Sequence, residues 1–141
     1  MNVQEPVAFD PFMQKDASDC GVACLQMMTG LSYEQVLKAC PRKAKQEGLS
    51  NRQLLNVAKK LGFPLRYIKT TEPGHHVGIL DLHRPADPAN RKGEWEGHFV
   101  MFMRNSLYNP AEGTVWTDVD TFLKTRRWEP LGIFVREGQT V

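Results

Sequence analysis

The chain has 141 residues, a length that suits one domain and is too short for two. Its apolar fraction of 41% and formal net charge of +2 are typical of a globular protein. Because 18 basic residues nearly balance 16 acidic ones, the composition argues against a nucleic-acid partner. The N-terminus lacks the basic start and apolar run of a secretory signal, and no stretch of 18 apolar residues is present that could insert into a membrane. We therefore expect a protein of the cytoplasm.

Helices are predicted for the N-terminal half, after an extended lead-in over residues 1–13. A single domain is expected to follow over residues 14–141. Apolar residues at helical spacing, serine or aspartate caps and a closing glycine or proline predict three helices, over residues 18–29, 32–40 and 50–61.

Strands are predicted for the C-terminal half, where short apolar and β-branched runs replace the helical spacing. These runs predict strands over residues 65–68, 77–80, 98–103, 114–116 and 132–135, and a return strand that begins at Leu107. A short helix is predicted over residues 118–123. A polar segment with proline and glycine, residues 83–97, is expected to form a loop that bulges over one end of the sheet. Helices followed by antiparallel strands are the order of an α+β fold.

The three cysteines cannot all pair within one chain, so reduced thiols are expected. Cys20 and Cys24 lie one helical turn apart, but no second close pair of ligands follows at the spacing of a zinc site. We therefore expect no metal and no cofactor. Cys24 continues the apolar stripe of its helix and is expected in the core, and Cys40 has no assigned role.

Cys20 is the thiol best placed for chemistry, because it lies in the first turn of a predicted helix. The partial positive charge and free N–H groups of a helix N-terminus favour a thiolate over a thiol. Gly21, the next residue, would let a substrate backbone approach the sulfur. A small buried cysteine is the alternative for Cys20.

A nucleophilic cysteine needs a base, and the base needs an orienting group. His98 is predicted to start the strongest strand, directly after Gly97, where its side chain can point toward a cleft. Asn109 follows on the return strand. A turn centred between Met103 and Arg104 would make His98 and Asn109 direct cross-strand neighbours, and a shift of one residue would place them diagonally or on opposite faces.

Two further groups would complete such a site. Gln14, six residues before Cys20, could join the backbone N–H of Cys20 in binding an oxyanion. Trp95 and Gly97, beside His98, are placed to line a substrate cleft, although Trp95 could equally be an exposed loop residue.

Together these residues resemble the C39 family of papain-like cysteine peptidases, the group that processes bacteriocins at double-glycine leaders. Residues 14–25, QKDASDCGVACL, are similar to the cysteine signature of that family nearly position by position. His98-Phe-Val resembles its histidine strand, and Tyr108-Asn-Pro-Ala-Glu-Gly resembles its Asp-Pro-x-x-Gly stretch. Residues 118–128 resemble its closing helix.

The resemblance implies a papain-like fold in which N-terminal helices pack on a C-terminal antiparallel sheet. It implies Cys20 as nucleophile, His98 as general base and Gln14 as oxyanion donor. Asn109 stands where the family usually has Asp, although papain-like enzymes use Asn in this role. The family domain is commonly fused to a transporter, which this chain lacks, so a stand-alone cysteine peptidase acting on a peptide or protein is expected.

Two other functions fit the same residues. The chain could be a catalytically weak or inactive papain-like module that only binds a peptide or partner protein. It could also retain the catalytic centre but carry out acyl transfer or deamidation, because papain-like sites support several acyl chemistries.

Overall fold

The computed structural model describes residues 19–42, 44, 48–85 and 95–138, so the predicted lead-in lies outside the described part. The fold is α+β, as predicted, with four helices and a six-stranded antiparallel sheet among the described residues. The helices are α1 (Cys20–Thr29), α2 (Tyr33–Ala39), α4 (Asn51–Lys60) and α6 (Val119–Arg126). The strands are β1 (Leu65–Lys69), β2 (Val77–Pro85), β3 (Trp95–Met103), β4 (Ser106–Asn109), β5 (Thr114–Trp116) and β6 (Glu129–Arg136).

Local sequence signals explain where the helices begin and end. Both α2 and α4 begin with a complete capping box, Ser32 with Gln35 and Ser50 with Gln53, which satisfies backbone N–H groups that a helix start leaves open. Helix α1 ends at Gly30, whose φ of 75° is the left-handed conformation that glycine adopts at low cost. The three predicted N-terminal helices are thus confirmed.

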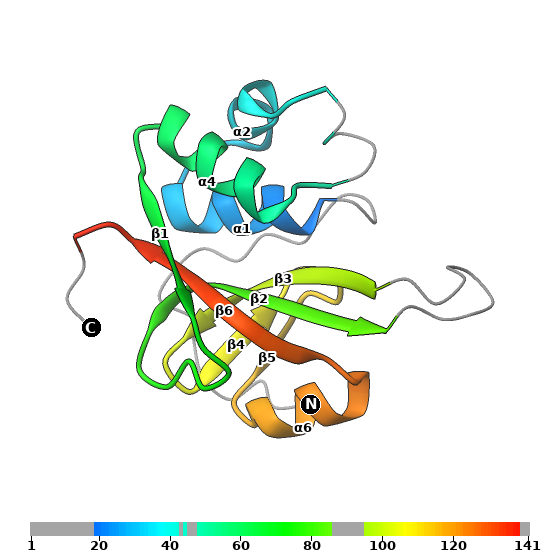
Figure 1. Cartoon of the computed structure of the whole chain (residues 1–141). Coiled ribbons are helices and arrows are strands. Elements are labelled where there is room, and N and C mark those ends of the chain that lie inside the picture. Colours follow the sequence, from blue (N-terminus) through cyan, green and yellow to red (C-terminus); the bar gives the residue numbers. More distant parts are fainter. Residues whose placement is uncertain (1–18, 43, 45–47, 86–94, 139–141) are drawn as a thin grey trace.

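The sheet separates two hydrophobic layers. Its strand order is β1-β6-β2-β3-β4-β5, and Figure 1 shows α1, α2 and α4 over one face with α6 at the other. Side chains alternate along each strand, so neighbours in β3 belong to different layers. Phe99 and Met101 pack with the three N-terminal helices, whereas Val100 and Phe102 pack with α6 and Trp128.

The prediction of a loop over residues 83–97 is wrong at both of its ends. β2 continues to Pro85 and β3 begins at Trp95, and the two strands stay paired from Val77↔Met103 to Pro85↔Trp95. The end of β2 and the start of β3 are rich in polar residues. Pairs across the two strands, such as Arg84 with Glu96, nevertheless stabilise the extended backbone there. His98 is therefore the fourth residue of β3 rather than its first.

A buried carboxylate ties the helical layer to the sheet. Asp81 is buried and accepts hydrogen bonds from Asn51 Nδ2 at 2.8 Å and from the Tyr67 hydroxyl at 2.7 Å. Burial and the bond to Asp81 raise the pKa of Tyr67, so its hydroxyl keeps the proton that it donates. The ring of Tyr67 lies over Gly132, where a Cβ would come within 2.7 Å of the Ile68 carbonyl oxygen as well as against the ring.

No helix of the described ranges is long and apolar enough to span a bilayer.

Replacing Gly132 by alanine is expected to destabilise the protein, because the new Cβ would collide with backbone and displace Tyr67 from Asp81. Overpacking typically costs about 1–3 kcal/mol. Urea unfolding followed by circular dichroism would measure the loss. Gly97→Ala is the matched control, since a Cβ there meets only the Leu82 carbonyl oxygen at 3.6 Å. Equal stability of the two variants would contradict this account of the Gly132 contact.

Candidate active site

Cys20 is the first residue of α1, and its position depends on the glycine that follows. A Cβ on Gly21 would lie 3.1 Å from Leu49 Cδ1 and 3.3 Å from Phe99 Cδ2, so the helix start packs closely against β3. The Cys20 thiol accepts backbone hydrogen bonds from Phe99 and Gly21. Phe99 directly follows His98, and the thiol therefore lies at the same level of β3 as the predicted base.

Burial raises the pKa of Cys20 above 9.0, although the nearby backbone N–H groups lower it in part and the charge of Asp19 adds to the rise. The helix N-terminus was expected to favour the thiolate, and this expectation is wrong for the chain without substrate. Removing the thiolate from water costs more free energy than its interaction with the helix N-terminus provides. The resting thiol is thus neutral, and a base must take its proton.

His98 and Asn109 are joined by a hydrogen bond of 2.7 Å between Nε2 and Oδ1. The β3–β4 pairs Met101↔Tyr108 and Phe102↔Leu107 place the turn at Arg104 and Asn105. Extending this register by one pair sets Asn109 opposite Val100, two residues from His98. The diagonal arrangement is therefore the correct one, and it leaves both side chains on one face.

The orientation of the Asn109 amide is fixed on both sides. Its oxygen also accepts from the Ala111 N–H at 3.3 Å, and its nitrogen donates to Glu112. Because an amide oxygen only accepts, His98 must carry its proton on Nε2, which leaves Nδ1 free to take another.

Glu112 is held by Arg126 through two hydrogen bonds of 2.8 Å, and this contact is the main reason that the pKa of Glu112 is lowered. The Glu112 carboxylate, which contacts the Asn109 amide, is thus ionised. Sequence reasoning missed Glu112, although it lies only three residues after Asn109 and such spacing suits a turn contact.

Burial lowers the pKa of His98 below 6.5, and the charge of Arg84 lowers it further. The hydrogen bond to Asn109 and the charges of Glu112 and Glu96 act in the opposite direction but are weaker together. The imidazole is therefore neutral near pH 7, the form that a general base requires.

Trp128 stacks on the imidazole on the α6 face of the sheet. Its ring stacks on His98 with a centroid distance of 5.4 Å and an interplanar angle of 23°, and Trp128 is buried. The tryptophan is brought there from the segment between α6 and β6, 30 residues along the chain, so no local spacing could pair it with His98.

The structure places the other predicted residues as follows. Gln14 lies outside the described residues. Trp95 and Gly97 lie on the same face of β3 as Phe99, the face toward α1, by strand alternation. Trp95 is 59% exposed, and its ring stacks on His83 at a centroid distance of 4.6 Å. Gly97 is exposed, and a Cβ there would meet only the Leu82 carbonyl oxygen, at 3.6 Å.

The remaining thiols are buried. Cys24 is fully buried in the core, as predicted, and Cys40 is also buried. Within the described ranges no three His, Cys, Asp or Glu side chains are grouped to hold a metal.

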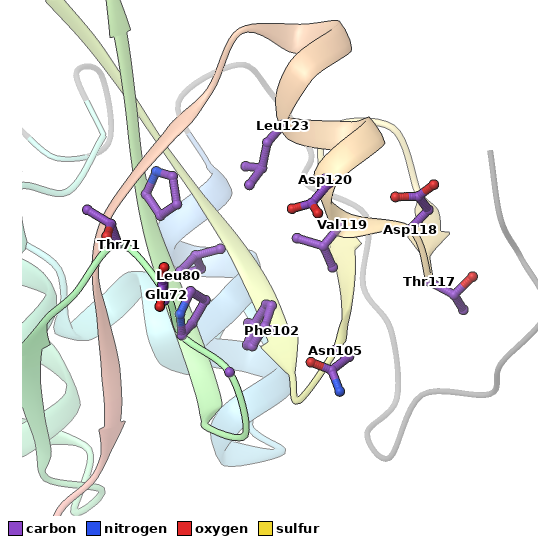
Figure 2. Close-up of a pocket in the computed structure, with 13 residues that line it drawn as sticks. Thr71, Glu72, Leu80, Phe102, Asn105, Thr117, Asp118, Val119, Asp120 and Leu123 are labelled. Atoms are coloured by element: carbon purple, nitrogen blue, oxygen red, sulfur yellow. The ribbon is translucent and has the colours of Figure 1, made fainter.

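A separate pocket of ≈ 480 Å³ lies on the α6 side of the sheet. Figure 2 shows Val119, Asp120 and Leu123 of α6 facing Leu80 and Phe102 across it. None of the predicted site residues lines this pocket. The pocket lies on the face of the sheet where His98 stacks on Trp128, whereas Cys20 belongs to the helical layer on the other face.

The lowered pKa of His98 predicts acid sensitivity. Protonation is disfavoured in the fold, so this residue's contribution to stability is complete above about pH 6.5 and is lost as the pH falls toward the folded-state pKa. Urea unfolding at several pH values between 5 and 8 should show a steeper loss on acidification for the unmodified protein than for His98→Gln. Parallel curves for the two proteins would contradict the burial argument.

Residues 9–137 match the model of the Peptidase C39 family. A search of curated proteins found no match to the chain. The matched segment extends from before α1 through β6 and covers both hydrophobic layers, and helices packed on an antiparallel sheet are consistent with the papain-like fold of this family. The chain therefore belongs to the peptidase C39 family.

Proposed function

We propose that the protein is a cysteine peptidase in which Cys20, His98 and Asn109 form the catalytic triad. The observation that carries the proposal is the 2.7 Å hydrogen bond from His98 Nε2 to Asn109 Oδ1. It leaves Nδ1 as a proton acceptor at the level of β3 where the Cys20 thiol lies. Membership of a peptidase family supports a peptide or protein as the substrate.

In the proposed reaction, His98 Nδ1 takes the thiol proton while the Cys20 sulfur attacks the carbonyl carbon of the scissile peptide bond. The tetrahedral intermediate then expels the amine, which receives the proton from His98, and a thioester remains on Cys20. Water, deprotonated by His98, hydrolyses the thioester and restores the thiol. Because the resting thiol and imidazole are both neutral, proton transfer accompanies attack rather than preceding it.

The oxyanion of the intermediate needs fixed donors. The backbone N–H of Cys20 at the start of α1 is one, and we assign the side-chain amide of Gln14 as the second. Gly97 and Trp95 are assigned to the substrate cleft, whereas Gly21, which was predicted to let a substrate approach, is buried against Leu49 and Phe99. Gly97 leaves room for a peptide backbone beside β3, and Trp95 offers an exposed aromatic surface on the same face.

A binding module is the second candidate, because the neutral resting state of Cys20 is also what a non-catalytic thiol would show. Acyl transfer or deamidation would use the same first step and differ in what attacks the thioester or in which amide is cleaved. Mass analysis of the products separates these reactions from hydrolysis.

Cys20→Ala is expected to abolish peptide cleavage while leaving the fold intact, since alanine fits the start of a helix. Cleavage would be measured with a proteome-derived peptide library, read by the new N-termini produced. Cys40→Ala is the matched control and should retain activity. Full cleavage by Cys20→Ala would contradict the proposal.

Alkylation with iodoacetamide provides a test that needs no substrate. Cys20 should react before the buried Cys24 and Cys40, and its rate should fall in a His98→Ala variant. Equal, slow labelling of all three thiols would favour a binding function instead.

Asn109→Ala is expected to lower kcat rather than raise KM, because the amide orients His98 without contacting the substrate. Loss of one hydrogen bond worth about 0.5–1.5 kcal/mol corresponds to roughly two- to tenfold in rate. Steady-state kinetics would measure it, with Asn105→Ala in the exposed β3–β4 turn as the control. A change confined to KM would place Asn109 in substrate binding.

A further inference from the structure

We propose that Arg84 is a positioning residue for His98 and acts through Trp128. This inference rests on the proposed role of His98 as the general base. Arg84 was predicted only as part of a polar loop, and neither the family match nor the triad assigns it a role.

The register of β2 and β3 places Arg84 beside His98. Arg84 pairs with Glu96 and Leu82 pairs with His98, so Arg84 and His98 are diagonal neighbours on one face of the hairpin. Arg84 Nε donates to Glu96 Oε1, which holds the guanidinium on this face.

Trp128 contacts both side chains at once. The guanidinium carbon of Arg84 lies 3.9 Å from the centroid of a Trp128 ring, and the same side chain stacks on His98. A cation over an indole face is a favourable electrostatic contact, stronger when water is excluded. Arg84 therefore stabilises the tryptophan in the position that fixes the plane of the imidazole.

A third contact attaches α6 to the hairpin. Arg84 Nη1 donates to the backbone carbonyl of Arg126 at 2.6 Å, at the end of α6, where a carbonyl has no partner within the helix. Arg127 then adopts a φ of 61° and the chain reverses into Trp128. The arginine thus bonds to the element that delivers Trp128 as well as to its ring.

The charges that face His98 come from three elements. Arg84 on β2 opposes protonation of the imidazole, whereas Glu96 on β3 and Glu112 after β4 favour it. Glu112 is paired with Arg126 and Glu96 with Arg84. Removing the Arg84 charge leaves Glu96 unpaired as well, and both changes favour the imidazolium, which cannot accept the proton of Cys20.

The test compares Arg84→Gln, which removes the charge, with Arg84→Lys, which keeps it without the planar group. Arg136→Gln is the matched control, because Arg136 also lies over an aromatic ring, Phe63, at 4.5 Å but on the far end of β6. NMR titration of the imidazole Cε1–H signals reads His98 directly in the folded protein.

For Arg84→Gln we expect the His98 titration to move to higher pH and kcat/KM at pH 6 to fall about threefold or more, with KM little changed. In Arg84→Lys, His98 should titrate at nearly the same pH as in the unmodified protein, because the charge is kept. Its kcat should stay below that of the unmodified protein, because the planar group is lost. Arg136→Gln should change neither. An Arg84→Gln variant that folds, as judged by circular dichroism, but keeps the His98 titration and the pH profile would overturn the inference.

The experiment separates this inference from the proposed function. Full activity of His98→Ala would refute the general-base role, whereas the NMR titration reports the coupling of Arg84 to His98 without any substrate. A fall in thermal stability of Arg84→Gln with an unmoved titration would show a structural contact only and would also overturn the inference.

Discussion

The close packing of helix α1 on strand β3 is the constraint on which the site depends. A side chain at Gly21 would press against Leu49 and Phe99, and the lack of one brings the helix start near enough for the Cys20 thiol to meet the backbone of Phe99. The same contact buries the sulfur and raises its pKa. One steric requirement therefore both positions the thiol and keeps it neutral, so that the proposed chemistry must rely on a base.

Alternate residues of strand β3 pack into the two hydrophobic layers on opposite faces of the sheet. Phe99 packs toward the helices that carry Cys20, whereas Val100 packs toward α6 and Trp128. His98 stacks on Trp128 and extends to Asn109 at the end of the short strand β4. The environment of the imidazole is thus built by the α6 layer, and the environment of the thiol by the helical layer.

Prediction from sequence worked best where the signal was local. The capping boxes at Ser32 and Ser50 and the glycine at position 30 each act within a few residues, and the helices form where they indicate. The hairpin arms were mistaken for a loop because Arg84 and Glu96 look solvated in isolation. Their extended conformation is stabilised by the strand opposite, and that partner cannot be read from either segment alone.

The sequence by itself predicted the α+β order, a helix with Cys20 in its first turn, and Cys20, His98 and Asn109 as the candidate site residues. Only the tertiary structure decided the diagonal register that joins His98 to Asn109, the burial that raises the pKa of Cys20, and the contacts of Arg84 and Trp128 with the imidazole. The physical reason is the distance along the chain over which each interaction acts. Caps and residue types act along the chain, whereas burial and ring contacts are set by segments that meet only after folding.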